Sequence, residues 1–557
     1  CSSSARRRRA GQPASNLRVS SAFLSFAMPP SARVAPCALL VALQLFDGCW
    51  AVGPAMRGTA AARGEPSTSI FDLVEAELGT EWRRATEALV GNSSDIWETM
   101  YKTLPKNDQG SVDAAATQYS LNRFFLQKYR WRVRGLALSG TAWGKNTSML
   151  VVEEKMPSGL RRYFRDRVFQ QGMVQQDLAA LAATIELFIR DEAKQELRSA
   201  YKTLDLNPEG KISWDSARDV LNVYTTCFQS GINVSRLISE EAWREKLDTP
   251  DSRAKAESWI KASPYPDLES YSFTQVHAFL QVFAEAHLHH VHDMWSSMKD
   301  RLLTFEGSSS GRIRLSDFYA SKEEKGWTGF DERREFLQQL GVLDESDVQQ
   351  TRLIIPNYLL NPMNCAGPWG YYATCSFNEC EFLMSDLERA LGSPEAAPSV
   401  IAEKIAALPS STVKAPRALP SALVRKLEEV AEHHKGSVPI HGRLFFQWMH
   451  FAYPTECPYP FPSEKTKPMS DTQFRAETGL EPLYSEQELK ELTKASSQLT
   501  PHLNCDENAD QCLAMWTPEE ELVQHRKVAL APSHRHHADS ASMTTPGAAA
   551  GEDPRPQ

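Results

Sequence analysis

Apolar side chains recur at helical spacing along most of the chain. From residue 70 onward, Ile70, Val74, Leu78, Trp82 and Leu89 follow the three-to-four-residue period of an amphipathic helix. The same period marks residues 175–204, 275–294, 330–340 and 423–434. Residues 67–69 supply serine and threonine hydroxyls that suit the start of a helix. The pattern predicts a mostly α fold built from several helical modules.

Four segments repeat a helix–loop–helix pattern. Residues 100–112 (MYKTLPKNDQGSV) align without a gap with residues 200–212 (AYKTLDLNPEGKI), and residues 298–318 and 431–442 are weaker copies. A repeated unit predicts a repeated structural module. We therefore predict loops at 105–116, 205–216, 306–317 and 431–442. In each loop a glycine occupies position 6 and an apolar β-branched residue occupies position 8.

Polar residues alternate along the second loop. Asp205, Asn207 and Glu209 occupy positions 1, 3 and 5, and Gly210 allows the sharp turn. Oxygen ligands at alternate positions of a curling loop converge on a hard cation such as Ca²⁺, which takes six to eight oxygens. Position 12, where a bidentate glutamate completes such a shell, is Ser216.

The predicted metal ligands lie in the second and third loops. They are Asp205, Asn207, Glu209 and Lys211 at 205–216, and Glu306, Ser308, Ser310 and Asp317 at 306–317. Few carboxylates contribute, so any calcium binding is expected to be weak, with Kd in the range ~10⁻⁴–10⁻³ M. The alternative is that the loops bind no ion. The apolar residue at position 8 can join a partner loop through a short β-bridge in either case.

These loops resemble degenerate members of the EF-hand superfamily. Residues 75–530 as a whole are similar to a group of secreted, largely uncharacterised EF-hand-domain proteins of unicellular algae. The likeness lies in DLAALAATIELFIRDEA (177–193), GVLDESD (341–347), IIPNYLLNPMNC (354–365), GRLFFQWMHFAYPTECPYP (442–460) and MWTPEEEL (515–522). The resemblance implies calcium-ion binding and no established enzymatic activity.

We place the EF-hand-like region at 70–345, and a cysteine-containing helical module follows it at 346–462. Cys365, Cys375, Cys380 and Cys457 lie in this module, and Cys505 and Cys512 follow it. Their spacing fits no zinc ribbon, so disulfides are expected in a secreted chain. We predict a local Cys505–Cys512 bridge and a free thiol at Cys227.

An alternative for the same module is an enzyme that uses cysteine and histidine. It would pair Cys375 or Cys380 with His441 or His450. No motif supplies an oxyanion hole or a third orienting group, and oxidation would remove the thiols. We therefore assign no catalytic or cofactor-binding residue.

The charge and composition of the chain indicate which classes of partner it could bind. The 557 residues carry a formal net charge of −9, which argues against a dedicated nucleic-acid binder. Residues 121–136 interleave bases with aromatic rings, which could stack on nucleic acid, but an amphipathic helix is favoured. Residues 275–294 contain five histidines. Pairs three apart could share a metal, but a solvated histidine-rich face is favoured.

The ends of the chain resemble processing and tail segments. We interpret 1–27 as an upstream leader or fragment, 28–51 as a signal peptide with an apolar core at 35–46, and 52–69 as a linker. The expected location is outside the cell or in the secretory lumen, or a plastid if the linker acts as a second signal. Sequons at Asn92, Asn146 and Asn233 agree with secretion.

After signal cleavage we predict no transmembrane anchor, because no other run of about 20 apolar residues occurs. Residues 463–528 are polar with a short helix at 486–493, and 529–557 form a disordered tail. The sequence as a whole predicts a secreted helical scaffold that binds calcium weakly and presents surfaces to an unknown protein partner. A secreted enzyme and a purely structural protein without metal remain the alternatives.

Overall fold

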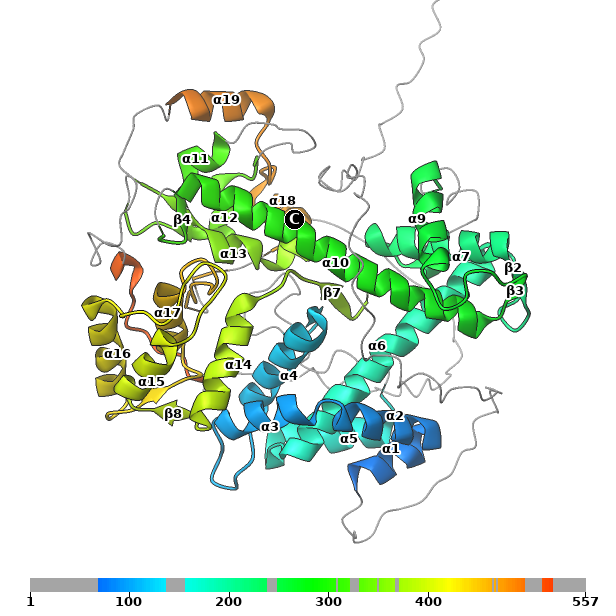
Figure 1. Ribbon diagram of the computed structural model, residues 1–557, viewed down its shortest axis with the longest axis horizontal. Coiled ribbons are helices and arrows are strands. Elements are labelled where there is room, and N and C mark those ends of the chain that lie inside the picture. The colour runs from blue at the N-terminus through cyan, green and yellow to red at the C-terminus, as the bar shows by residue number, and fades with distance from the viewer. Residues whose placement is uncertain are drawn as a thin grey trace, which may run out of the picture.

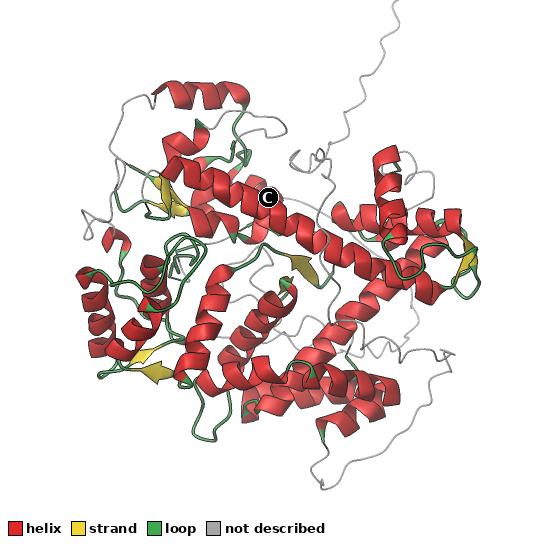
Figure 2. Ribbon diagram, in the orientation of Figure 1, coloured by secondary structure: helices red, strands yellow, loops and turns green. Residues whose placement is uncertain are grey.

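The structure of the protein is a computed structural model. It describes residues 69–136, 156–237, 248–306, 309–320, 330–347, 350–365, 370–462, 465–466, 469–495 and 513–523. The predicted leader, the signal peptide, nearly all of the linker, the tail and the Cys505–Cys512 pair lie outside these residues. Helices dominate the described chain, which confirms the mostly α fold class (Figure 2).

The first half of the chain supplies the two longest helices. Its elements are α1 (Ile70–Leu78), α2 (Thr80–Gly91), α3 (Ser94–Thr103), α4 (Ala114–Tyr129), β1 (Trp131–Val133), α5 (Ser158–Asp166), the π-helix η3 (Arg167–Gln171), α6 (Gln175–Thr203), β2 (Ile212–Ser213), α7 (Trp214–Gln229), η4 (Val234–Arg236), α9 (Pro250–Lys261), β3 (Ser270–Tyr271) and α10 (Phe273–Glu306).

Shorter helices and two-to-three-residue strands make up the second half. They are β4 (Arg312–Arg314), α11 (Leu315–Tyr319), α12 (Arg334–Gln339), β5 (Leu343–Asp344), β6 (Arg352–Ile354), α13 (Ile355–Leu359), η5 (Pro362–Asn364), β7 (Tyr372–Thr374), α14 (Glu379–Leu391), β8 (Glu395–Ala396), α15 (Pro398–Ala406), α16 (Ser421–His433), β9 (Val438–Pro439), α17 (Arg443–Ala452), α18 (Asp471–Thr478), α19 (Glu486–Ala495) and η6 (Leu513–Met515).

Helix–loop–helix units associate in four pairs. Pair I joins α3–α4 to α5–α6, pair II joins α6–α7 to α9–α10, pair III joins α10–α11 to α12–α13, and pair IV joins α14–α15 to α16–α17. In every pair the two loops meet in a short antiparallel contact. The four predicted loops each contribute one side of such a contact, and each lies between two helices.

The residue at position 8 of each loop makes this contact. Val112 lies opposite Met173 in pair I, Ile212 opposite Tyr271 in pair II, Ile313 opposite Leu353 in pair III, and Val438 opposite Ala396 in pair IV. Pair III adds β5, so that its sheet has the order β4-β6-β5. Because β6 follows residue 346, this sheet crosses the boundary that the sequence suggested between modules.

Each pair encloses a hydrophobic core of its own. The core of pair I also takes in α1, and that of pair III takes in Phe474 of α18. Leu197 and Phe279 are completely buried in pair II, and Leu427 and Trp448 in pair IV. A helix with one apolar face is stable only when that face is covered, and here the second unit of the pair covers it.

Two long helices connect the first three pairs. The 29-residue α6 carries the core of pair I up to Ile189 and that of pair II from Leu197 onward. The 34-residue α10 likewise serves pair II with Val276–Phe283 and pair III with Val291–Leu302. Figure 1 shows α6 running from the α1–α2–α5 group toward β2 and β3, and α10 running from there to α11 and α12. Neighbouring pairs therefore share a continuous backbone.

Two predicted helices end earlier than their apolar pattern does. Gly79 has φ of 100°, and it separates α1 from α2 within the stretch expected to form one helix. At 121–136 the helix α4 stops at Tyr129, because Arg130 takes a left-handed conformation and the chain continues into β1. Strand β1 pairs with β7, with Trp131 opposite Thr374. The prediction of a helix to residue 136 was wrong.

The aromatic residues of that segment are used internally. Phe124 and Phe125 are buried in the core of pair I, and Trp131 packs on Tyr372 of β7 with 4.6 Å between ring centroids. Phe124 and Phe125 are therefore covered by protein, whereas Trp131 is half-buried. Arg123, expected at the solvated edge of the helix, is also buried.

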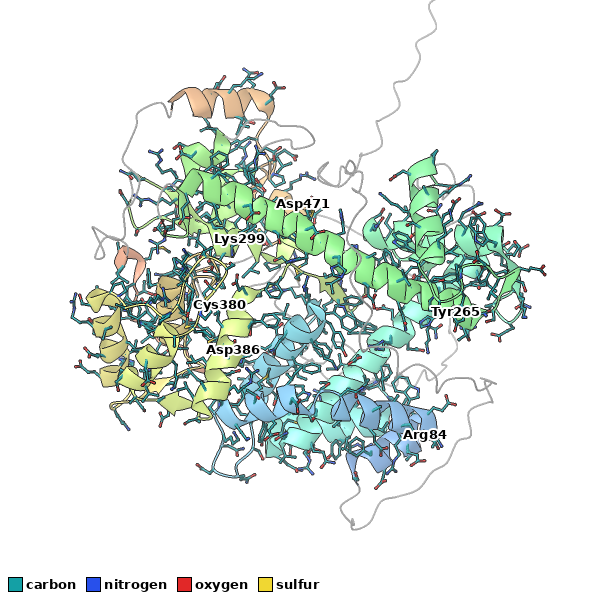
Figure 3. All side chains as sticks on the ribbon, in the orientation of Figure 1. Arg84, Tyr265, Lys299, Cys380, Asp386 and Asp471 are labelled. Carbon is teal, nitrogen blue, oxygen red and sulfur yellow. A yellow bond between two sulfur atoms is a disulfide. The ribbon has the colours of Figure 1, made fainter. Side chains whose placement is uncertain are left out.

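Disulfides tie the C-terminal part of the chain. Cys365 is bonded to Cys375, and Cys380 of α14 (labelled in Figure 3) is bonded to Cys457 after α17. The second bond lies within pair IV and closes a separation of 77 residues. Cys227 is free and buried in α7, as the sequence predicted.

A buried ionic cluster joins pair I to pair IV. The guanidinium of Arg123 on α4 binds the carboxylates of Glu388 and Glu381 on α14. His441, just before α17, lies 3.4 Å from Glu388, and its Nδ1 lies 3.1 Å from the Tyr119 hydroxyl. Burial alone would lower the pKa of Arg123, but the carboxylates of Glu388 and Glu381 raise it well above its ordinary value.

We expect Arg123→Met to reduce the free energy of unfolding by about 3–5 kcal/mol, because it leaves Glu388 buried without its cation. The double variant Arg123→Met/Glu388→Leu should recover a large part of this loss, since the fully buried carboxylate is then removed with its cation and only the less buried Glu381 remains without Arg123. Urea denaturation of the single and double variants measures the coupling. The exposed pair Lys102–Glu98 is the matched control, whose removal should change little. Equal losses in the single and double variants would contradict the expectation.

Candidate cation-binding loops

The backbone of the second loop is closed by Asn207. Asp205 follows α6 with a φ of 54°, and the Leu206 amide donates to the carbonyl of Tyr201 at 2.9 Å. The Asn207 side-chain oxygen accepts from the Glu209 amide at 3.0 Å, and the Gly210 amide donates to the Asn207 carbonyl at 3.2 Å. Asparagine favours such turns because its side chain imitates a backbone carbonyl.

The first loop makes the same turn without a carboxylate at position 1, 3, 5 or 12. The Asn107 side-chain oxygen accepts from the amides of Gln109 and Ser111, both at 3.0 Å. The Gly110 amide donates to the Asn107 carbonyl at 2.9 Å. The repeated asparagine and glycine therefore explain the shape of both loops.

All four predicted ligands in the second loop are exposed. They are Asp205, Asn207, Glu209 and Lys211. Asp205 and Asn207 line a shallow depression together with Arg198 and Lys202 of α6. The Glu209 carboxylate is paired with Arg198 at 2.9 Å, so a cation at this loop would compete with that guanidinium. Asp215, one residue before position 12, is paired with Arg218 at 2.9 Å.

The third loop is buried against pair IV. Glu306 accepts a hydrogen bond from the Gly311 amide, and both Glu306 and Ser310 are buried. A side chain at Gly311, where φ is 69°, would collide with the backbone carbonyl of Pro454 that follows α17. Asp317 is held by Arg314 at 2.7 Å. Ser308 lies outside the described residues.

Burial determines the charge of Glu306. Desolvation raises the pKa of its carboxyl group to about 7, although the backbone amides of Gly311 and Ser310 lower it. At neutral pH a large fraction of this side chain is therefore protonated. A protonated carboxyl group is a poor cation ligand.

The structure brings none of the predicted ligands into a cluster of the usual metal-binding side chains. Within the described residues, no group of three or more His, Cys, Asp or Glu side chains could hold a metal ion. Any ion at 205–216 would therefore depend on asparagine, backbone and water oxygens as well as on Asp205 and Glu209.

The histidine-rich part of α10 is only partly solvated. His289 and His290 are exposed, as expected, whereas His287 is buried between Phe228 and Phe283. Burial lowers the pKa of His287 to about 4. The prediction of a solvated face was wrong for this residue, because it lies on the side of α10 that covers the core of pair II.

The proposed cysteine–histidine alternative meets two obstacles in the geometry. Cys375 and Cys380 are both in disulfides and carry no thiol. His441 and His450 are buried, and burial lowers the pKa of His450 to about 3. The Nδ1 atom of His450 lies 2.8 Å from the Cys457 carbonyl, so this ring is used to fix the chain after α17.

Sequence reasoning missed one unit of every pair, namely the second unit of pairs I to III and the first unit, α14–α15, of pair IV. Tyr271 of β3 shows the signal that was available, since it is an isolated apolar residue in a polar stretch directly before a helix. The link before α6 is shorter still and contains Gly172 and Met173 alone between η3 and Val174. Such units lack a glycine two residues before the paired residue, which is the spacing by which the other units were found.

Known proteins give no further guidance on this site. Neither a family model, nor a curated protein, nor a solved structure matches the chain.

The raised pKa of Glu306 has a consequence for stability. The folded chain keeps a proton at pH values between 4.5 and about 7 that the unfolded chain has released, so stability should fall as pH rises through this window. Above it the effect is constant. Glu306→Gln should abolish this part of the pH dependence, which amounts to at most about 3 kcal/mol. Urea denaturation near pH 5 and near pH 8 measures it.

The control for this experiment is Glu335→Gln, which removes an exposed carboxylate on α12. The control should keep the pH dependence of the parent chain. If Glu306→Gln and the parent lose the same stability between the two pH values, Glu306 does not carry the effect.

Proposed function

We propose that the chain is a scaffold of EF-hand-like helix pairs that binds calcium weakly and presents its surfaces to a protein partner. The single observation that carries the proposal is the antiparallel contact at position 8 in all four pairs. The contact supports the proposal because the apolar residue at position 8 was expected to join a partner loop in this way.

The loop at 205–216 is the better candidate for calcium. Its turn is already formed by Asn207, and the carboxylates of Asp205 and Glu209 are open to solvent. Binding would therefore require no rearrangement of the core. The ligands proposed at 306–317 are less suitable, because Glu306 is buried and Asp317 is held by Arg314.

The mechanism follows from the position of the loop. It lies between α6 and α7, and its strand β2 is joined to β3 before α10. An ion that neutralises the loop would stiffen the angle between these helices and change the surface offered to a partner. The rival proposal, a purely structural role, keeps the same helix pairs and differs only in lacking the ion.

Export from the cytosol is part of the proposal. Two disulfides in the described chain support an oxidising compartment. No described helix has the length and apolar character needed to cross a bilayer. Of the sequons, Asn92 is exposed between α2 and α3 and Asn233 is half-buried before η4, whereas Asn146 lies outside the described residues. We propose glycosylation at the exposed Asn92.

Calcium titration of the full chain tests the ion. We expect saturable binding with Kd in the range ~10⁻⁴–10⁻³ M by calorimetry, and terbium luminescence sensitised by Trp214, which lies in the same loop. Asp205→Asn and Glu209→Gln should each weaken binding by roughly tenfold, because each removes a charged ligand. Asp215→Asn removes an exposed carboxylate beside the predicted ligands and should have little effect.

Absence of saturable heat up to about 10 mM calcium would remove the ion from the proposal and leave the structural role. An equal effect of Asp205→Asn and Asp215→Asn would show that binding depends on net charge alone.

Arg198 is expected to oppose calcium binding. Its guanidinium forms an ion pair with the Glu209 carboxylate at 2.9 Å, and this pair must break before Glu209 can bind an ion. Arg198→Gln should therefore tighten calcium binding by roughly two- to fivefold. Lys255→Gln is the matched control, since it removes one positive charge from α9 of the same pair. The calorimetric Kd values of the two variants are compared, and equal values would contradict a specific competition.

A further inference from the structure

The C-terminal segment 513–523 lies across pair IV as an extended peptide. It begins with η6 and continues along the start of α17, close to the end of α16 (Figure 1). Met515 is buried with Ile354 and Tyr459, and Val523 is buried in the core of pair I. Between these two anchors the side chains of Pro518 and Glu519 are exposed.

The surface under this segment contacts its backbone. We call this surface the groove, and it is formed by His434, Gly442, Arg443, Leu444 and Gln447. The Gln447 side chain donates to the Thr517 carbonyl and accepts from the Thr517 amide, both at 3.1 Å. Arg443 donates to the carbonyls of Thr517 at 3.0 Å and Glu519 at 2.7 Å. Gly442 forms a β-bridge with Leu522. Main-chain contacts of this kind are how proteins bind extended peptides of varied sequence.

One side chain of the segment is recognised through its charge. The Glu520 carboxylate accepts from the Leu444 amide at 3.1 Å, in the first turn of α17, and lies 2.7 Å from Nε2 of His434. The N-cap of α17 is Gly442, which has no side chain to serve this helix end. A carboxylate is favoured there because the exposed amides and the helix dipole are positive.

The groove needs an occupant. Arg443 and Gln447 are both buried, with 1% and 0% of their surfaces exposed. These exposures hold with segment 513–523 in place, and if it leaves, Arg443 and Gln447 lose the hydrogen bonds that they make to its backbone. Any extended main chain with a carboxylate at the right place restores the same bonds.

We propose that this groove is a recognition site for an extended acidic peptide of a partner protein, and that the chain's own segment 513–523 occupies it until the partner arrives. The peptide carries an apolar anchor at the place of Met515, a carboxylate at the place of Glu520 and a second apolar anchor at the place of Val523. Recognition at this groove is independent of calcium, because no residue of the loop at 205–216 takes part in the contacts described above.

The test uses the full chain with a protease recognition sequence placed between residues 496 and 504, so that the predicted Cys505–Cys512 bridge does not hold the two products together. After cleavage, a fluorescent peptide of residues 513–523 is added, and its anisotropy and co-elution with the protein are followed. Saturable binding that unlabelled peptide reverses is expected. The uncleaved chain should bind the peptide at least tenfold more weakly, since its own segment stays at high local concentration.

Matched peptides separate charge recognition from general attraction. A peptide with Glu520→Ala should bind at least tenfold more weakly. Glu519→Ala should change binding by less than about twofold, because the Glu519 carboxylate, although 3.7 Å from Arg443, is 54% exposed and screened by water. In the protein, His434→Ala should weaken the parent peptide but leave the affinity of the Glu520→Ala peptide unchanged, because the two side chains act on each other.

Three results would overturn the proposal. The cleaved segment could stay bound without exchange, or its release could abolish the helical circular dichroism signal, and either would make it a fixed part of the fold. Equal affinities for the Glu519→Ala and Glu520→Ala peptides would show that the site near His434 does not select the carboxylate.

Discussion

The fold depends on the fact that a single helix–loop–helix unit cannot bury its own apolar face. Two short helices leave most of their hydrophobic side chains open to water, and only a second unit can cover them. The antiparallel contact between the loops fixes how the two units meet, since Ile212 must lie opposite Tyr271 for β2 and β3 to pair. This register fixes the positions of the two helix–loop–helix units of the pair relative to each other.

Buried polar groups fix the relative orientation of pairs I and IV, which apolar packing alone would not specify. Arg123 on α4 meets Glu388 and Glu381 on α14, so pair I and pair IV have one favourable orientation. Burial beside Arg123 lowers the pKa of His441 well below its ordinary value, which keeps the ring neutral. A carboxylate cannot donate, so Nε2 carries the proton toward Glu388 and Nδ1 accepts from Tyr119. Buried networks of this kind contribute to specificity more than to stability.

The local features of the fold could be predicted from the sequence. The Tyr-Lys-Thr-Leu repeat located two loops, and position 8 identified the residues that pair across them. What escaped prediction depends on contacts distant in the chain. Helix α4 ends where it does because β1 finds β7, more than 200 residues later. Glu306 has the residue type of a ligand, but Pro454 from another pair covers its loop and changes its charge.

The candidate site shows the same division. Spacing in the sequence identified Asp205, Asn207 and Glu209, and the structure places all three on an exposed turn. Spacing could not show that Arg198, about two helical turns before the loop, would already pair with Glu209. Nor could it show that the Glu520 carboxylate would accept a hydrogen bond from the Leu444 amide in the first turn of α17, because these residues are 76 apart in the chain.

The continuous helix α10 gives the molecule a lever. Its 34 residues extend over about 50 Å, with the core of pair II at one end and that of pair III at the other. A tilt of roughly 5° where it leaves β3 would carry the far end through about 4 Å, a distance comparable to the width of a side chain. A small change in the tilt of α10 near β3 therefore becomes a displacement of several ångströms at pair III.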